Sequence, residues 1–99
     1  GSQLPLDRGS AAKVFAAHGL VDAAFTDEEM TSVRSTGLAE SVAEREVGLA
    51  SVSTPILGSN GAVLAVLSIS GPVERLKPSP AHIWGKELLA AAKKLMKAI

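Results

Sequence analysis

The 99-residue chain contains no cysteine and only three aromatic side chains, Phe15, Phe25 and Trp84. The missing thiols exclude disulfides, thiolate catalysis and cysteine-ligated zinc. Ten acidic residues balance ten basic ones, which excludes a broad cationic surface for nonspecific nucleic-acid binding. No apolar run approaches the ~20 residues of a membrane helix, and no basic segment followed by an apolar run begins the chain. This composition predicts a soluble, cytoplasmic protein with no membrane partner.

Apolar residues make up 46% of the chain, enough for a packed core in one small domain or in part of a larger one. Gly1-Ser2 looks like a cloning remnant, and Pro5 stands in a segment without a clear period. We therefore expect residues 1–8 to form an N-terminal loop and residues 9–99 to form the domain.

Three helices are expected. The segment Gly9–His18 has apolar residues at helical spacing. A second helix begins at Thr26, whose side chain can form a reciprocal capping box with Glu29, and it ends at Gly37. The third begins near Pro80 and runs to the C-terminus, with Ser79 available as its cap. Its apolar stripe comprises Trp84, Leu88, Ala91, Ala92, Leu95 and Ile99.

Three strands are expected between the second and third helices, at Leu38–Val42, Gly48–Leu57 and Ala62–Ser70. The sequence Gly-Ser-Asn-Gly at residues 58–61 is a strong hairpin signal. Pro55 indicates an edge, or an interruption of pairing, near the end of the middle strand. The element order α-α-β-β-β-α predicts an α+β fold, with an antiparallel sheet and flanking helices.

Side-chain alternation places four serines on one face of this hairpin. With an even-numbered loop, Ser51 lies opposite Ser68 and Leu49 opposite Ser70, and Ser53 shares their face. A three- or five-residue loop would set serines opposite aliphatic residues, so the even loop is preferred. The other face should pack against helices; its expected pairs are Ala50–Ile69, Val52–Leu67, Thr54–Ala65 and Ile56–Val63.

The serine face has two interpretations, which the residues alone leave open. It is either an ordinary solvent-exposed face or the floor of a small-molecule pocket. Hydroxyls can donate to a carboxylate or a carbonyl. Since no basic side chain lies on this face, a bound anion would be held by hydroxyls and backbone N–H groups.

Several segments resemble the effector-binding domain of IclR-type bacterial transcription regulators. They are Gly48–Ile56, Asn60-Gly61, and Leu67-Ser68-Ile69-Ser70-Gly71-Pro72 with Arg75-Leu76. Gly9–Val14 is similar to the family's Gly-x-x-Gly-Lys segment, with Ala12 in place of the second glycine. Met30–Ala39 is similar to its Ile-Arg-x-x-Gly-Tyr-Ala passage, with Leu38 in place of the aromatic. The resemblance covers residues 5–99.

The resemblance implies the C-terminal half of a GAF-like domain that binds a small organic acid or aromatic effector and forms homo-oligomers. It implies pocket roles for Ser51, Ser68 and Ser70. Ser41 stands where the family often has an acidic residue. No cofactor is implied. Together with strand parity, the expected ligand-binding residues are Ser51, Ser68, Ser70, Ser53, Leu49 and Ser41.

The family's N-terminal winged helix-turn-helix and the first half of its effector domain have no counterpart in the sequence. We therefore expect contact with operator DNA only through that absent domain. The open edge of the hairpin predicts association with another chain, through the sheet or by exchange of elements.

The sequence also bears on two other classes of function. A hydrolase built on His18 or His82 is disfavoured, because there is no Gly-x-Ser-x-Gly motif and neither histidine has an obvious acidic partner. Two histidines so far apart are also a weak metal signal. The remaining alternative is a pure self-association module that binds no ligand.

Overall fold

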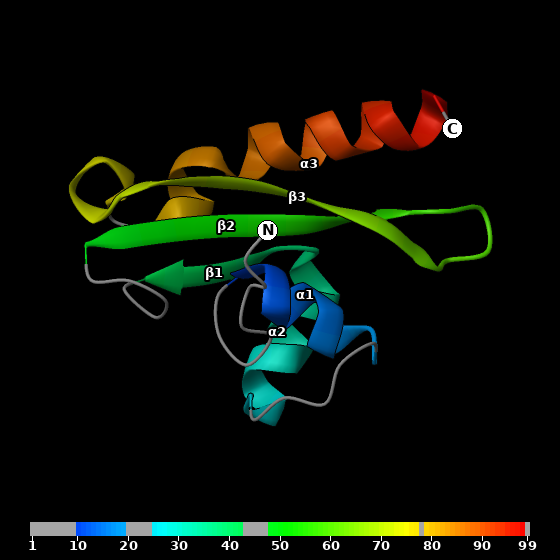
Figure 1. Cartoon of the computed structure of the whole chain (residues 1–99), viewed down its shortest axis with the longest axis horizontal. Helices are drawn as coiled ribbons and strands as arrows, with labels where there is room; N and C mark the ends of the chain where they lie inside the picture. Colours follow the sequence, from blue (N-terminus) through cyan, green and yellow to red (C-terminus); the bar gives the residue numbers. More distant parts are fainter. Residues whose placement is uncertain (1–9, 20–24, 43–47, 78, 99) are drawn as a thin grey trace, which may run out of the picture.

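The computed structural model describes residues 10–19, 25–42, 48–77 and 79–98. Its elements, in chain order, are α1 (Ser10–Ala17), α2 (Asp27–Thr36), β1 (Ala39–Val42), β2 (Leu49–Leu57), β3 (Val63–Pro72), the 3-10 turn η1 (Val73–Leu76) and α3 (Pro80–Ala98). They form three layers, with α3 on one face of the antiparallel sheet β1-β2-β3 and with α1 and α2 on the other (Figure 1). The predicted α+β class and element order are confirmed. The expected starts of the domain and of the first helix, at residue 9, lie outside the described residues.

The ends of α2 follow the predicted local chemistry. The Glu29 N–H donates to Thr26 Oγ1 at 3.1 Å, and the Thr26 N–H donates to the Glu29 carboxylate at 3.3 Å. This reciprocal capping box occupies two N–H groups that a helix start leaves without partners. Gly37 ends the helix at φ +77°, and its N–H donates to the Val33 carbonyl. A glycine adopts this left-handed conformation without steric cost.

The hairpin register differs from the predicted one by two positions. Ser51 pairs with Ser70 and Ser53 with Ser68, whereas the prediction paired Ser51 with Ser68. Leu49 lies opposite Pro72 rather than Ser70, so β3 continues past its predicted end. On the other face the expected pairs shift in the same way. A shift of two leaves every side chain on its predicted face, because side chains alternate with a period of two.

The cause of this shift lies at the turn. The Gly58 N–H donates to the Ala62 carbonyl, which leaves a three-residue turn, with Gly61 at φ +81°. The preference for an even loop was therefore wrong. A three-residue turn alone would place the serines of β3 on the opposite face from those of β2. Leu64, however, is an extra residue of β3 between the pairs Ile56–Ala65 and Leu57–Val63. This one-residue bulge restores the alternation.

Pro55 lies inside β2 without breaking its pairing with β3. It is partnered by Val66, whereas the β1 ladder stops at the pair Ala39–Ser53, two residues earlier. The Val73 N–H donates to the Gly48 carbonyl, and from this pair the hydrogen-bonded positions alternate along the hairpin. Pro55 is not in one of these hydrogen-bonded pairs, so the N–H that proline lacks would have pointed away from β3, toward β1. Because the β1 ladder already ends opposite Ser53, no β1 residue loses a hydrogen bond there.

Helix α3 covers the apolar face of β2, as expected. Ser79 Oγ accepts from the His82 N–H at 3.1 Å, which confirms the predicted cap. The buried stripe of α3 is rotated from the predicted one. Leu88 and Ala92 face the sheet, whereas Trp84 and Leu95 are 41% and 47% exposed. The predicted stripe therefore includes one exposed flank of the helix.

Apolar side chains are buried on both sides of the sheet. Between α3 and the sheet, Val52 and Ile56 contribute from β2. Beneath the sheet, the core cluster consists of Val14, Ala17, Met30, Val33 and Ala39, with Val66 packed against it. Helix α1 therefore lies against the same face of the sheet that carries the serines.

Candidate functional site: the hydroxyl face

Four of the predicted site residues meet in two neighbouring cross-strand pairs, Ser51–Ser70 and Ser53–Ser68. Ser41 belongs to β1, which pairs with the other edge of β2. It lies directly opposite Ser51 and is 4% exposed. Because directly opposed residues of antiparallel strands share a face, these five serines line the same side of the sheet. Leu49 shares this side, two residues before Ser51, and is 41% exposed.

A chain of hydroxyl–hydroxyl hydrogen bonds joins the strands to the first residue of α1. Ser10 Oγ lies 2.6 Å from Ser51 Oγ and 2.7 Å from Ser53 Oγ, and Ser53 Oγ lies 2.6 Å from Ser68 Oγ. Ser10 was absent from the predicted site, because more than forty positions separate it from its partners. The available signal was its place beside Gly9 in the segment similar to Gly-x-x-Gly-Lys. We call Ser10, Ser51, Ser53, Ser68 and Ser70 the hydroxyl face.

Exposure within the hydroxyl face is graded. Ser53 is fully buried and Ser10 nearly so, whereas Ser51 is half-buried and Ser68 and Ser70 are exposed. The idea of a simply solvent-exposed face is therefore wrong for its inner half. The outer hydroxyls remain accessible, and within the described part of the chain Ser70 Oγ has no hydrogen-bond partner.

The start of α1 adds backbone donors to the hydroxyl face. The first N–H groups of a helix have no partner within it and carry the positive end of the helix dipole. Ser10 is the first residue of α1, and its hydroxyl touches Ser51, so these donors lie beside the serines. Hydroxyls at a helix start can hold an anionic group without a basic side chain.

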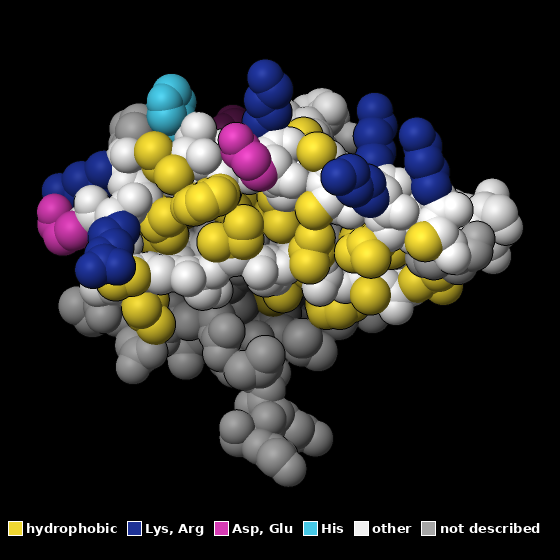
Figure 2. Space-filling view, turned by 90° about the horizontal axis from the view of Figure 1, so that it is seen from above, with side chains coloured by type: hydrophobic (Ala, Val, Ile, Leu, Met, Phe, Trp, Pro, Cys, Tyr) yellow, Lys and Arg dark blue, Asp and Glu magenta, His cyan; other side chains and the backbone are white. Residues whose placement is uncertain are grey.

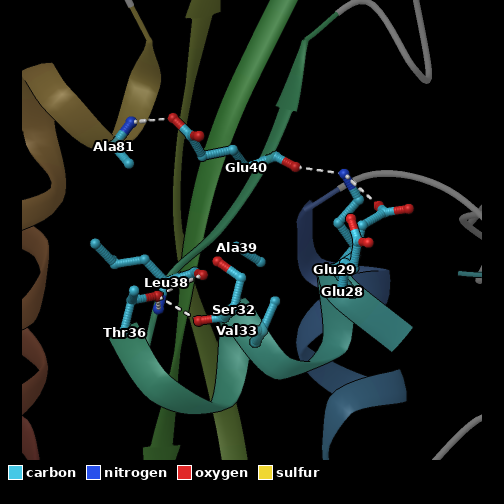
Figure 3. A pocket seen from close by; sticks show the side chains of 10 residues that line it. Glu28, Glu29, Ser32, Val33, Thr36, Leu38, Ala39, Glu40 and Ala81 are labelled. Carbon is cyan, nitrogen blue, oxygen red and sulfur yellow. Dashed lines mark hydrogen bonds and ion pairs between the residues drawn. The ribbon is translucent and has the colours of Figure 1, made fainter. Parts of the chain in front are cut away.

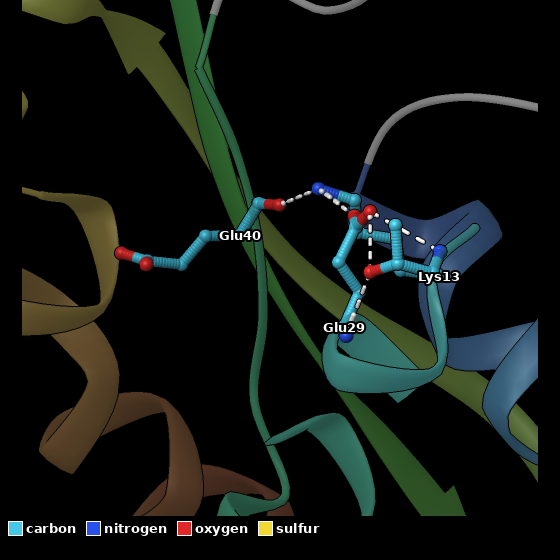
Figure 4. A network of polar contacts seen from close by, with 4 residues as sticks. Lys13, Glu29 and Glu40 are labelled. Carbon is cyan, nitrogen blue, oxygen red and sulfur yellow. Dashed lines mark hydrogen bonds and ion pairs between the residues drawn. The ribbon is translucent and has the colours of Figure 1, made fainter. Parts of the chain in front are cut away.

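Among the described residues, Lys13 is the basic side chain nearest to Ser10 in sequence, but its amine is engaged elsewhere. Its Nζ donates to the Glu40 carbonyl at 2.6 Å and lies 3.3 Å from the Glu29 carboxylate (Figure 4). It also lies 5.9 Å from the centre of the Phe25 ring. One buried lysine thus links α1, α2 and β1. This linkage orients α1, and with it Ser10, against the sheet.

The same contacts change the acidity of Glu29. Burial by itself would raise the pKa of its carboxyl. The hydrogen bond from the Thr26 backbone N–H, together with Lys13, outweighs burial and lowers the pKa below its usual value. The charged form of Glu29 is therefore the one that the fold favours.

A separate groove of about 410 Å³ lies along the outer side of β1, between α2 and the start of α3 (Figure 3). Carboxylates of Glu28, Glu29 and Glu40 line it. Glu40 Oε1 accepts from the Ala81 N–H at 2.8 Å and so caps the first turn of α3. With three acidic side chains and one lysine already engaged with Glu29, this groove does not suit a carboxylate ligand.

The two histidines lie away from the hydroxyl face. His18 follows the last residue of α1, His82 lies in the first turn of α3 on the other side of the sheet, and both are exposed. Within the described ranges, no three His, Cys, Asp or Glu side chains come together in a group able to hold a metal. None of the described helices is both long and apolar enough to cross a bilayer.

Comparison with known proteins tests the predicted resemblance to IclR-type regulators. The profile of the protein family described as "Bacterial transcriptional regulator IclR C-terminal" matches residues 8–97. The chain belongs to this family. IclR proteins are transcription regulators, and the matched region corresponds to their C-terminal effector-binding domain. No curated protein sequence matches the chain significantly.

Solved structures of IclR-type proteins share the fold. The inducer-binding domain of PobR from Acinetobacter, a double mutant crystallised with 3-hydroxybenzoic acid, is 21% identical and superposes with a TM-score of 0.79. The C-terminal domain of E. coli KdgR is 25% identical with a TM-score of 0.77. HmgR of Pseudomonas aeruginosa is 25% identical with a TM-score of 0.83.

The chain is shorter than these relatives. The PobR alignment covers 100% of the chain and 69% of that domain, and the KdgR alignment covers 98% and 72%. The HmgR alignment covers 99% of the chain but 46% of that protein. The chain therefore spans about 70% of an IclR effector-binding domain and less than half of a longer IclR protein.

Proposed function

We propose that this IclR-type domain senses a small organic acid or aromatic carboxylate, which binds where the start of α1 meets the hydroxyl face. The observation that carries the proposal is the convergence of five serine side chains and a helix start on one face of the sheet. The ligand carboxylate would accept hydrogen bonds from Ser70, Ser68 or Ser51 and from the first N–H groups of α1. Leu49 would contact its apolar part.

The chemistry of the hydroxyl face and the similarity to PobR both support a carboxylate as the ligand. The hydroxyl face offers donors and no carboxylate of its own, whereas the groove beside β1 carries three. PobR, which shares the fold, was crystallised with 3-hydroxybenzoic acid. We infer that regulation takes place in the cytoplasm, that the sensing unit is a homo-oligomer, and that another domain contacts operator DNA.

Thermal unfolding with a panel of small acids tests the proposal. A ligand at a hundred times its Kd stabilises the folded state by about 2.7 kcal/mol, which raises Tm by roughly 10–20 °C in a domain of this size. Benzoate and 3-hydroxybenzoate are suitable first probes. Their neutral amides are matched controls, since they keep the ring and remove the charge. A shift with the acids and not with the amides is the expected result.

Two serine variants localise the effect. Ser70→Ala should reduce the shift without lowering the Tm of the free protein, because the Ser70 hydroxyl has no hydrogen-bond partner among the described residues. Ser59→Ala, in the exposed hairpin turn, should change neither quantity. Equal shifts in both variants would mean that the acids bind elsewhere.

The other candidate is a pure self-association module. It is favoured by the mutual hydrogen bonds of Ser10, Ser51, Ser53 and Ser68, which satisfy these hydroxyls without a ligand. If no carboxylate in the panel shifts Tm, this second candidate replaces the sensing proposal.

A further inference from the structure

The middle strand of the sheet is longer than its neighbour β1. The β1 ladder ends at the pair Ala39–Ser53, whereas β2 continues to Leu57. Helix α3 packs mainly on β2, and the two run in the same direction (Figure 1). The C-terminal part of α3 therefore lies over the end of β2 that β1 does not reach.

A groove opens between α3 and this end of β2. Its first part, about 410 Å³, is lined by Thr54 and by one side of α3. Its second part, about 320 Å³, reaches the hairpin turn at residues 57–59, and Met96 lines both parts. Ligand pockets commonly have volumes of this size. We call this space the α3 groove; its defining residues are Thr54, Lys86, Leu89, Ala92, Lys93 and Met96.

The floor and the walls of the α3 groove are apolar. Ala92 and Thr54 are 1% and 2% exposed, and the Thr54 hydroxyl already donates to the Gly37 carbonyl at 2.6 Å. Leu89 and Met96 are half-buried and lie two helical turns apart, on the same side of α3. A ligand in this groove would therefore contact hydrocarbon along most of its length.

Two lysines form the outer rim of the groove. Lys86 and Lys93 are also two turns apart, and both are exposed. Neither has a hydrogen bond or an ion pair with any described residue. No acidic side chain in the described ranges lines either part of the groove. Figure 2, which looks onto α3, shows basic side chains in a row along one border of the hydrophobic band. The rim therefore carries two available positive charges.

We propose that the α3 groove binds a free fatty carboxylate. Lys86 and Met96 are about 15 Å apart along the helix axis, which suits a chain of about ten carbons. The hydrocarbon chain would lie along Leu89 and Met96 and point toward the hairpin turn. Its carboxylate would accept hydrogen bonds from the amines of Lys86 and Lys93. Because α3 covers the face of the sheet opposite the serines, this site is separate from the hydroxyl face.

Burial and charge together select this class of ligand. Each CH2 group that is buried strengthens binding by about fourfold, so short acids should bind far more weakly. The two lysines favour an acid over a neutral alcohol and disfavour a cationic amphiphile. Because both amines are exposed, the attraction should weaken as the salt concentration rises.

Methyl NMR of the whole chain tests the site, because the chain has only two methionines, Met30 and Met96. Met30 belongs to the core cluster on the other side of the sheet and serves as an internal control. In a sample labelled with ¹³C at the methionine methyl groups, decanoate below its micelle concentration should shift the Met96 signal saturably and leave the Met30 signal in place. Butyrate has the charge but little chain, and decanol has the chain without the charge. Each should give a far weaker response.

Two double variants locate the charge contact. Lys86→Gln with Lys93→Gln removes both rim charges and should raise the Kd for decanoate about fivefold. Lys94→Gln with Lys97→Gln removes the same net charge from exposed positions of the same helix that do not line the groove. This control should change the Kd by less than about twofold. Since all four lysines are exposed, neither double variant should alter the circular dichroism spectrum.

Four results would overturn the proposal. They are an unchanged Met96 signal, equal responses to decanoate and decanol, equal Kd changes in the two double variants, and a response of Met96 to vesicles of anionic phospholipid but not to the free acid.

This site does not depend on the sensing proposal. Ser70→Ala should reduce the Tm shift with benzoate and leave the decanoate titration of Met96 unchanged. If Ser70→Ala abolishes the Met96 response, decanoate binds at the hydroxyl face and the α3 groove is not its site. If Met96 responds to decanoate but benzoate shifts no Tm, the α3 groove stands and the sensing proposal fails.

Discussion

Replacing Lys13 with methionine tests the central contact between the helices and the sheet. Met is close to Lys in length and helix propensity, so Lys13→Met mainly removes the charge and the hydrogen bonds of the amine. The Glu40 carbonyl would lose its 2.6 Å donor, and the Glu29 carboxylate would lose a cation at 3.3 Å.

The expected loss follows from these two contacts. Leaving a buried carbonyl without a partner costs about 1–3 kcal/mol. A partly exposed ion pair contributes only about 0.2–1 kcal/mol, and the Glu29 side chain is 40% exposed. Since water can reach an edge carbonyl once the lysine is gone, we expect a total near the lower end of the combined range, about 1–2 kcal/mol.

Urea unfolding at neutral pH measures this loss as a lower midpoint at an unchanged m-value. Lys86→Met, at an exposed position of α3, is the control and should stay within about 0.5 kcal/mol of the parent chain. A double-mutant cycle with Glu29→Gln should show coupling. If Lys13→Met is as stable as Lys86→Met, or if the effects of Lys13→Met and Glu29→Gln are additive, then the contacts of Lys13 do not stabilise the packing of α1 and α2 on β1.

Three further results are expected. Thr26→Ala removes the side-chain acceptor of the capping box, leaves the backbone N–H bond to Glu29, and should lower the free energy of unfolding by about 1 kcal/mol, whereas Thr31→Ala, exposed on α2, should have little effect. The pKa of Glu29 is lower in the folded state than in the unfolded state. Its contribution to stability is therefore present above the unfolded pKa and lost as pH falls through the folded pKa. Urea midpoints measured between neutral and acid pH should fall less steeply for Glu29→Gln than for the parent chain. Gly61→Ala forces a Cβ into a left-handed turn and should cost about 1–2 kcal/mol, read from the same urea titration.

Local chemistry explains most of what the sequence predicted correctly. The Thr26–Glu29 box, the Gly37 cap and the Ser79 cap each depend on residues within four positions of one another. Side-chain alternation likewise placed Ser51 with Ser53 on one face of β2, and Ser68 with Ser70 on one face of β3, because it depends only on each residue's position within its own strand. Such signals require no knowledge of tertiary contacts.

The pairing register depended on a feature that alternation cannot reveal. The odd turn and the bulge at Leu64 each shift the register by one position in the same direction, so together they leave the faces unchanged while moving each partner by two positions. Nothing in the local sequence distinguishes this arrangement from an even turn without a bulge.

Tertiary packing accounts for the other differences. Ser10 joins the hydroxyl face because Lys13 and the apolar residues of α1 fix that helix on the sheet, more than forty positions from its serine partners in the chain. The α3 stripe was predicted from hydrophobicity alone, which cannot separate residues that face the sheet from an apolar flank. Trp84 and Leu95 belong to that flank.

Chemical-shift mapping of a ¹⁵N-labelled sample tests the sensing site most directly. We expect 3-hydroxybenzoate to produce its largest amide shifts at the start of α1, from Ser10 to Ala12, and at Ser51 and Ser70, with 3-hydroxybenzamide producing far smaller ones. Shifts concentrated instead along the groove lined by Glu28 and Glu40, or equal responses to the acid and the amide, would contradict carboxylate binding at the hydroxyl face.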